Sequence, residues 1–432
     1  MLRPGQVVLL CALALLTLGV VMVNSAGMSV TPLPTGAVKP GAEAPPPSPG
    51  ITAESILTSR AAVYMLAAVG MMAFASVMPV RKLAEVVSSR EKHLGLHPLS
   101  GLWPFGLGIF VLLSVVLLVY VPGLSRTVNG ATRWISVPGL GSVQPSEIAK
   151  WAVPVLIAWY GVRRAHVAKR FWIGTLPALL GIGLIAGAVV LEDLGTGLLI
   201  GVAGVLVLLA AGTPLKHIAV WAPPAAGALA LAVLTSPYRV ERVITFLDPY
   251  ADPQGSGYHM IQSLTTVAGG GGFGRGLGHG LQKFGYLPED TTDFLFAVVA
   301  EELGIAGAAL VVFLFSTMVI ALWSIVQRER SPMLKLYALG VLATIGMQAV
   351  MNLMVVTGLG PTKGIALPLV SAGGTGWVLT AISLGLVVSI DRSGVGQAAD
   401  QDGNDAEAEA EIESNEPSIR EVKPLRRARE AA

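Results

Sequence analysis

The sequence predicts an all-α polytopic membrane protein with about ten transmembrane helices and a large extracytoplasmic loop between spans seven and eight. Three observations support this fold class. Hydrophobic residues make up 53% of the 432 residues and charged residues only 13%. The mean hydropathy is +0.68, and a soluble domain of such composition lacks the polar residues to cover its surface. Apolar windows of roughly 20 residues, the length needed to cross a bilayer as a helix, recur along the chain.

Ten apolar windows are candidate spans, in chain order 6–25, 61–79, 104–122, 148–162, 172–191, 194–212, 217–236, 294–325, 335–357 and 366–390. The fifth and sixth are barely separated, and 294–325 is long enough for one tilted helix, so nine or eleven spans remain open. The first window has a basic start and small residues near Ala26, which also suits a cleaved signal peptide. Its length favours a retained span.

The basic residues predict the orientation, because Lys and Arg near span ends are retained in the cytoplasm. Loops on one side are rich in them: Arg81, Lys82, Arg90, Lys92, Arg163, Arg164, Lys169, Arg170, Lys216, Arg328, Arg330 and Lys335. Loops on the other side carry fewer: Lys39, Arg60, Arg126, Arg133 and Lys363. We therefore expect both termini in the cytoplasm and the loop 238–293 outside. The net charge of +2 gives no reason to expect nucleic acid as a partner.

Two segments have the composition of disordered chain. Residues 31–60 begin with a proline-rich stretch that is typical of an extended linker, here external. Residues 393–432 form an acidic and then basic tail, predicted to be cytoplasmic and solvated. The chain has no convincing internal repeat, which weakens a transporter built from inverted halves.

Polar residues at the ends of the spans are the best candidates for function, because they are expensive at membrane depth. Arg133 and Trp134 precede the fourth span, and Glu147 and Lys150 lie at its start, three residues apart, where they can form an ion pair. A helix start with a local ion pair explains the last two without any function. The functional interpretation has Arg133 and Lys150 hold phosphate while Trp134 packs on a sugar or lies in the interfacial belt.

The segment between spans five and six and the large loop carry further candidates. Glu192 and Asp193 are explained by an external hairpin turn. The loop 238–293 opens with Arg239 and Arg242 and contains the glycine-rich stretch 269–280, whose amides suit an anion. That stretch lacks the ending of a nucleotide-binding loop.

The loop ends with a carboxylate at the mouth of the eighth span. The stretch from Tyr286 to Asp293 includes Glu289, and Glu301 and Glu302 follow two turns later, where at most one of them can face Asp293. As a helix-start aspartate, Asp293 also suits a simple N-terminal cap. Lys363 precedes the last span, near the outer surface.

Together these segments resemble the SEDS family of FtsW/RodA-type peptidoglycan glycosyltransferases. The resemblance covers nearly all of residues 1–392 and is most specific at 129–134, 144–150, 248–262, 286–304 and 361–374. The 361–364 stretch, with 248–249 and 255–258, is more similar to the FtsW branch than to RodA.

The resemblance implies polymerisation of lipid II, with undecaprenyl-pyrophosphate-linked glycan, at the outer face of the cell inner membrane during division. It also implies a class B penicillin-binding protein as transpeptidase partner, and other divisome proteins. Asp293 matches the essential aspartate, and Trp134, Glu147, Lys150 and Lys363 match residues of the same cavity. Glu289 of the same stretch completes the expected substrate-binding set with Arg133 and Arg239. No cofactor is certain, and a divalent cation, Mg²⁺ or Mn²⁺, is compatible with a pyrophosphate leaving group.

The chain departs from the family pattern at three places. Thr291 stands where a histidine is usual, Ala372 stands where a tyrosine is usual, and Leu191 and Glu192 replace Gln-Pro. Two rival functions therefore stay open, a lipid II flippase or transporter and a non-catalytic division scaffold. A transporter predicts charged groups throughout the mid-membrane path, whereas the charges here gather at the outer mouth.

Overall fold

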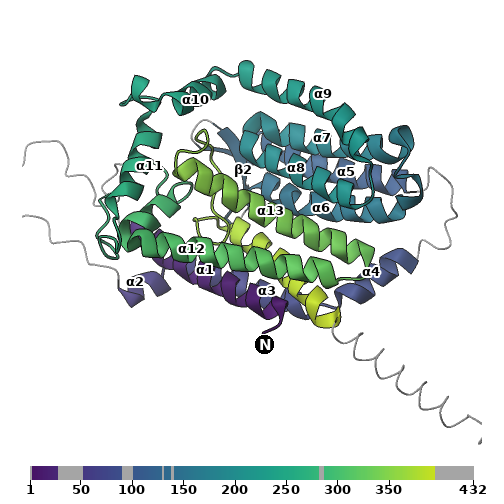
Figure 1. Cartoon of the computed structure of the whole chain (residues 1–432), viewed down its shortest axis with the longest axis horizontal. Coiled ribbons are helices and arrows are strands. Elements are labelled where there is room, and N and C mark those ends of the chain that lie inside the picture. The colour runs from purple at the N-terminus through teal and green to yellow at the C-terminus, as the bar shows by residue number, and fades with distance from the viewer. Residues whose placement is uncertain are drawn as a thin grey trace, which may run out of the picture. The chain divides into compact units, whose positions relative to one another are not determined.

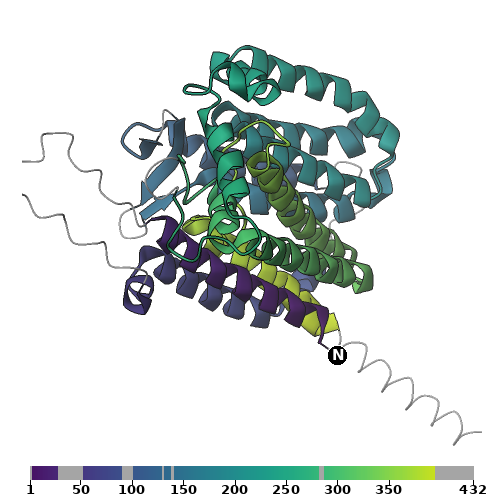
Figure 2. The same ribbon diagram turned by 60° about the vertical axis from the view of Figure 1, so that its left-hand side comes forward.

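The protein is a bundle of long helices with a small sheet at one end (Figures 1 and 2). The computed structural model describes residues 2–27, 52–89, 101–128, 131–137, 141–281 and 287–394. Most of the predicted linker and the tail beyond residue 394 lie outside the described residues. A short helix within the predicted linker range, α2 (Ala53–Leu57), is described.

The long helices are α1 (Pro4–Ala26), α3 (Arg60–Val77), α5 (Leu102–Leu117), α6 (Pro145–Arg163), α7 (Leu176–Glu192), α8 (Leu194–Ala210), α9 (Leu215–Leu234), α12 (Leu295–Arg328), α13 (Pro332–Val356) and an unlabelled helix Thr375–Gly394. Eight described helices are long and apolar enough to cross a membrane, with α7 extended back to Phe171. The apolar α8 is shorter, and α6, which carries Glu147 and Lys150, is not among the eight. The predicted count of ten spans stays a prediction.

Shorter elements lie between the long helices. They are α4 (Val80–Ser89), α10 (Pro237–Leu247), α11 (Tyr258–Gly269), the single turns Leu118–Tyr120, Ala165–Val167, Phe171–Thr175 and Pro249–Ala251, and strands β1 (Ser125–Val128), β2 (Ala131–Val137) and β3 (Gly141–Val143). The strands form one antiparallel sheet in the order β1-β2-β3. The predicted loop 238–293 therefore contains two helices, α10 and α11.

The core forms where the long helices pack on one another. Helix α1 packs along α12, α13 packs on α6, α8 and α12, and α5 packs on α7. Retention of the first window as a span stays a prediction. Helix α9 contacts α7 and α10 but buries few of its side chains, and it lies at the rim of the bundle (Figures 1 and 2).

Helix α12 is interrupted at Gly304, which has φ 67° and ψ −163°. A residue with a side chain rarely adopts this backbone conformation, so glycine permits the break. The break separates a short buried segment, 295–303, from the long apolar segment that follows. The expectation of one continuous span over 294–325 is corrected accordingly.

The last span begins at Thr375, not at residue 366 as the hydropathy predicts. Residues 365–370 are buried or nearly so but not helical, and Leu369 and Gly374 have positive φ angles of 63° and 45°. A hydropathy window cannot distinguish a buried extended segment from a helix. Such backbone is tolerated at membrane depth where other helices surround it.

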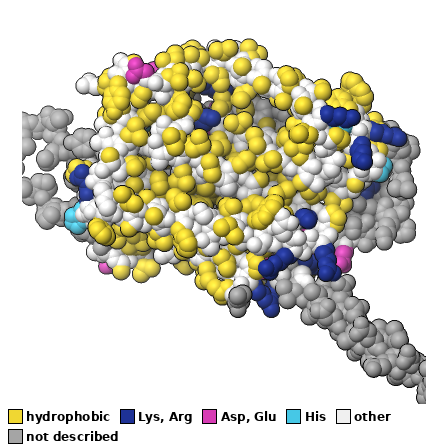
Figure 3. Space-filling model, viewed as in Figure 1, with side chains coloured by type: hydrophobic (Ala, Val, Ile, Leu, Met, Phe, Trp, Pro, Cys, Tyr) yellow, Lys and Arg dark blue, Asp and Glu magenta, His cyan; other side chains and the backbone are white. Residues whose placement is uncertain are grey.

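The surface is mostly apolar on the face that Figure 3 shows. Many of the Lys and Arg side chains on this face gather at its right-hand end and lower right edge, away from α10 and α11 (Figures 1 and 3). This distribution fits the predicted cytoplasmic side, and the orientation itself stays a prediction.

Candidate active site

Asp293 lies just before α12, at the start of the short buried segment. Phe294, not Asp293, occupies the N-cap position of α12, so the simple capping role is wrong. The Asp293 carboxylate lies against the backbone of Gly364: a Cβ on Gly364 would be 3.1 Å from Asp293 Oδ2 and 3.6 Å from Arg133 Nη1. The aspartate, the arginine and the extended segment before Ile365 therefore meet at one point.

The environment of Asp293 favours its protonated form. Burial, together with the negative charges of Glu289 and Asp193, raises the pKa of Asp293 to about 7. The positive charges of Arg133 and Arg242 act in the opposite direction. Because the resulting pKa is near neutrality, this carboxyl can both take up and release a proton at physiological pH.

Arg133 reaches the site from an irregular point of β2. In the pairing of β1 with β2, Arg126 lies opposite Trp134 and Thr127 opposite Thr132, so Arg133 is the extra residue of a bulge. Bulges redirect side chains and are frequent next to active sites. Arg133 Nε donates to Glu192 O at 2.9 Å, and Thr132 N donates to Glu192 Oε2 at 3.1 Å. These two hydrogen bonds to Glu192 hold β2 of the sheet against the junction of α7 and α8.

Asp193 is the residue that the sequence analysis missed. It does form the expected turn, since its carboxylate accepts from Thr196 N at 3.0 Å and from Thr196 Oγ1 at 2.9 Å as the N-cap of α8. Its charge also raises the pKa of Asp293 and of Lys363, which shows that it faces the same site. One feature of the sequence could have indicated this role: Asp193 lies between two predicted spans, at their predicted outer end.

Two further cations lie near Asp293. Lys363 is half-buried, and its burial lowers its pKa while Asp193 opposes that shift. Arg242, on α10, donates from Nη1 to Thr362 O at 2.9 Å, which ties α10 to the segment that contains Lys363. Arg242 was outside the predicted set, although it lies one turn beyond Arg239 on the same helix. Arg133, Arg242 and Lys363 thus place three cations among the carboxylates of Asp193, Glu289 and Asp293.

Glu147 and Lys150 form the predicted ion pair, with Lys150 Nζ 2.7 Å from Glu147 Oε2. Lys150 is 2% exposed and donates also to Glu147 Oε1 at 2.8 Å and to Gln348 Oε1 at 3.0 Å. Its hydrogen-bond donors are therefore used within the protein. A direct contact of Lys150 with phosphate stays a prediction and requires that these bonds open.

The hydrogen bonds and strand pairing of the other predicted residues involve parts of the protein other than the Asp293 side chain. Arg239 donates to the carbonyls of Ala232, Val190 and Leu191 at 2.6–3.0 Å, so it caps helix ends. Glu289 is exposed, has φ 56°, and accepts from Thr292 Oγ1 at 2.7 Å. Trp134 is half-buried opposite Arg126. Substrate binding by these residues stays a prediction.

The glycine-rich stretch binds an anion of the protein itself. The amides of Gly278 and Gly280 donate to the Glu302 carboxylate at 3.1 and 3.3 Å, and Leu281 N donates to Glu301 Oε1 at 3.0 Å. Ser25 of α1 donates to Glu302 Oε2 at 2.6 Å. Both glutamates are buried at the end of the 295–303 segment, and they hold this stretch against α1 and α12. Neither is among the charges that shift the pKa of Asp293.

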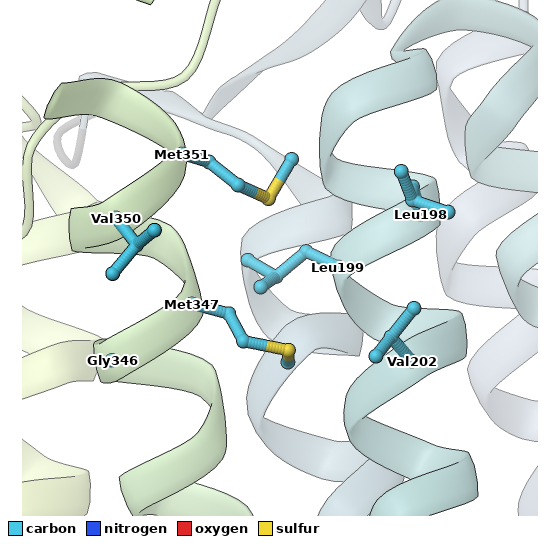
Figure 4. A pocket seen from close by; sticks show the side chains of 7 residues that line it. All are labelled: Leu198, Leu199, Val202, Gly346, Met347, Val350 and Met351. Carbon is cyan, nitrogen blue, oxygen red and sulfur yellow. The ribbon is translucent and has the colours of Figure 1, made fainter. Parts of the chain in front are cut away.

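An apolar cavity of about 280 Å³ lies between α8 and α13 (Figure 4). Its lining includes Leu198 and Val202 on α8 and Met347 and Met351 on α13, with no polar side chain. It is separate from the Asp293 site.

Comparison with known proteins decides the family. The family model of the FtsW, RodA and SpoVE cell cycle proteins matches residues 101–395. The chain belongs to this family. The probable peptidoglycan glycosyltransferase FtsW of Geobacter sulfurreducens is 33% identical over 389 residues, which cover 90% of this chain and 95% of that protein. A protein of the same description from Alkalilimnicola ehrlichii is 41% identical over 292 residues, covering 66% and 71% of the two chains.

Solved structures of the FtsW/RodA/SpoVE family have the same fold. One is a chain from "Structural coordination of polymerization and crosslinking by a peptidoglycan synthase complex", with 25% identity and a TM-score of 0.64 over 90% of this chain and 97% of that one. Another is RodA of Thermus thermophilus, with 23% identity and a TM-score of 0.54 over 89% and 95% of the two chains.

Two departures from the pattern of the FtsW/RodA/SpoVE family lie side by side. Ala372 N donates to Thr291 O at 2.9 Å, so the positions of the usual tyrosine and histidine are neighbours. They border Asp293, which follows Thr291 by two residues. The departures therefore affect one edge of the site and leave Asp293, Arg133 and Lys363 in place.

The described residues contain no group of three or more His, Cys, Asp and Glu side chains that could hold a metal ion.

Asp293→Asn is expected to stabilise the protein above pH 7. Folding raises the pKa of this carboxyl from 3.8 to about 7, so the cost of burying its charge is absent below pH 4 and complete above pH 7. The neutral amide avoids a cost of about 1 kcal/mol, reduced because the carboxyl is partly exposed. The gain in stability is measured as the difference between the thermal unfolding midpoints of the variant and the wild type in detergent, at pH 8 and at pH 4.5. An equal gain at both values, or a lower midpoint at pH 8, would contradict the prediction.

Proposed function

We propose that the protein is a peptidoglycan glycosyltransferase that polymerises lipid II at the outer face of the cytoplasmic membrane during cell division. The observation that carries the proposal is Asp293, with a pKa of about 7, beside Arg133 and Arg242, with Lys363 next to the Gly364 that contacts its carboxylate. A base poised near neutrality next to cations suits attack by a hydroxyl on a donor with a pyrophosphate leaving group. The FtsW relatives are described by the same activity.

The proposed reaction joins two saccharides. The 4-hydroxyl oxygen of the acceptor sugar attacks the anomeric carbon of the donor chain, and Asp293 accepts the hydroxyl proton. A new glycosidic C–O bond forms as the bond from the anomeric carbon to the pyrophosphate oxygen breaks. The polyprenyl pyrophosphate leaves with the bonding electron pair, which increases its negative charge.

The cations stabilise the charge that develops on the leaving pyrophosphate. Arg133 can form bidentate hydrogen bonds with phosphate oxygens, whereas Lys363 acts as a point charge. The negative charge of Asp193 favours the charged form of Lys363 and so opposes the effect of burial on its pKa. The ion pair of Glu147 and Lys150 on α6 is connected to α13 through Gln348, which accepts a hydrogen bond from Lys150.

We propose a class B penicillin-binding protein as the partner, with other divisome proteins around it. The solved peptidoglycan synthase complex combines polymerisation with crosslinking, and the chain of that complex covers 90% of this protein. A glycan strand that leaves the Asp293 site needs such a crosslinking enzyme on the same side of the membrane. The basic loops separately predict that both termini lie in the cytoplasm.

A lipid II flippase is the second candidate, and the positions of the buried charges argue against it. Among the described residues, the buried acidic, basic and histidine side chains lie within about two turns of helix ends: Lys150, Arg164, Asp193, His217, Glu301, Glu302 and Glu329. A path for a pyrophosphate headgroup through the membrane calls for such groups along its whole length. Their absence from the middle of the described helices argues against such a path.

The rate of polymerisation is expected to rise with pH and to level off above about 7. The raised pKa of Asp293 means that the base is protonated, and therefore inactive, below that value. Initial rates of glycan formation from purified lipid II between pH 5 and 9 measure this dependence. Half-maximal rate near pH 4, the range of an ordinary carboxyl, would contradict the assignment of Asp293 as the base.

A further inference from the structure

Two amide side chains on α13 connect it to the site. Gln348 and Asn352 lie one turn apart on one face of the helix. Gln348 Nε2 donates to Ala366 O at 2.8 Å, and Gln348 Oε1 accepts from Lys150 Nζ. Asn352 Nδ2 donates to Ile365 O at 2.7 Å and to Asp293 O at 2.8 Å. The two amides therefore fix consecutive carbonyls of one segment, and Asn352 also fixes Asp293.

The orientation of the Asn352 amide follows from its partners. Both partners are carbonyl oxygens, which only accept, so the NH₂ group must face them. The Asn352 Oδ1 atom is then buried with no hydrogen-bond partner among the described residues. Leaving a buried acceptor unpaired is unfavourable. This cost accompanies the two hydrogen bonds by which the NH₂ group joins the carbonyls.

The two carbonyls bound by Asn352 belong to Asp293 and to Ile365, the residue after Gly364. Gly364 is bonded directly to Ile365, and its backbone approaches Asp293 Oδ2 so closely that a Cβ would lie 3.1 Å away. Asn352 thus holds both partners of this contact through one side chain. A shift of either would change the distance from the carboxylate to Arg133.

We propose that Asn352 is a positioning residue, which holds the Asp293 carboxylate against Gly364 and Arg133 in the geometry needed for proton transfer. This inference rests on the proposed function. Without the amide, the carboxylate has more freedom and more contact with water. A displacement of about 1 Å at a reacting group can cost on the order of 100-fold in rate.

The test compares Asn352→Leu, which keeps the branching and loses the amide, with Thr344→Val two turns earlier on α13. Thr344 is also buried, but among the described residues its hydroxyl bonds only to Gly340 O of its own helix. Full-length protein polymerises lipid II with its penicillin-binding partner, and kcat, KM and the pH of half-maximal rate are measured. Asn352→Ala replaces Asn352→Leu if the latter does not fold.

We expect kcat of the Asn352 variant to fall on the order of 10- to 100-fold, with KM changed less than about threefold. The pH of half-maximal rate should fall, because a better hydrated carboxyl has a lower pKa. Thr344→Val should keep wild-type kinetics within about twofold. Wild-type kcat and an unchanged pH profile in a folded Asn352 variant would overturn the inference. No polymer from wild-type protein would instead count against the proposed function.

A double-mutant cycle with Gly364→Ala separates positioning from a general loss of stability. The added methyl group displaces the Asp293 carboxylate directly, so it should cost less in the Asn352→Leu background, where that geometry is already lost. Its effect should be unchanged in the Thr344→Val background. Additive effects of Gly364→Ala and Asn352→Leu on kcat would overturn the inference.

Discussion

Asp293→Asn is expected to reduce polymerisation by on the order of 10³-fold, with lipid II binding retained. General base catalysis contributes about 10²–10⁴-fold, and the amide cannot accept the proton of the attacking hydroxyl. Because the amide has nearly the same shape, the contact with Gly364 survives. The expected signature is thus a loss of kcat with a nearly constant KM, measured with purified lipid II at pH 7.5.

Asp290→Asn is the matched control for the Asp293 substitution. This aspartate lies three residues earlier, is half-buried, and burial raises its pKa to about 6. By pKa alone it is a rival base, but it is not among the groups that shift the pKa of Asp293. We expect it to keep activity within about threefold, in line with small effects of substitutions away from reacting groups. The opposite result, with Asp290→Asn inactive and Asp293→Asn active, would reassign the base.

Glu147→Ala is expected to destabilise the protein by about 3 kcal/mol, because it leaves the charge of Lys150 buried without its ion partner. Gln348 still accepts one hydrogen bond from Lys150, so the loss lies at the lower end of the range for buried pairs. For a chain of this length this corresponds to a fall of about 3 °C in the thermal midpoint. Differential scanning fluorimetry in detergent would measure it.

A double substitution tests the cause of that instability. Glu147→Gln together with Lys150→Met removes both charges and should recover most of the thermal midpoint. Glu241→Ala removes an exposed carboxylate on α10 and should change the stability by less than about 0.5 kcal/mol. A midpoint for Glu147→Ala within 1 °C of wild type would show that Lys150 does not depend on its partner.

The sequence was sufficient to predict the membrane fold, most span positions and the meeting of several site residues. Composition and hydropathy windows sample the property that drives membrane insertion, so they locate helices such as α1, α7 and α13 well. The spacing of Glu147 and Lys150 predicted their ion pair because a helix brings residues three apart together. Asp293 was found from its place before an apolar span within matched motifs.

The remaining features depend on backbone geometry that residue patterns do not encode. The bulge at Arg133, the break at Gly304 and the buried extended segment before Thr375 each replace regular structure with a specific local conformation. Asp193 was interpreted as a turn residue, which is correct locally, but its approach to Asp293 depends on how α7, α8 and α12 pack. Gln348 and Asn352 looked like ordinary polar residues in a span until their carbonyl partners were known.

The most direct measurement is glycan polymerisation from purified lipid II in detergent by the full-length protein with its cognate class B penicillin-binding protein. Detergent removes the two sides of the membrane, so a flippase gives no product and only bond formation is detected. We predict glycan strands from the wild-type protein and on the order of 10³-fold slower formation by Asp293→Asn at equal folding. No polymer from folded wild-type protein with its partner bound would contradict the proposed function.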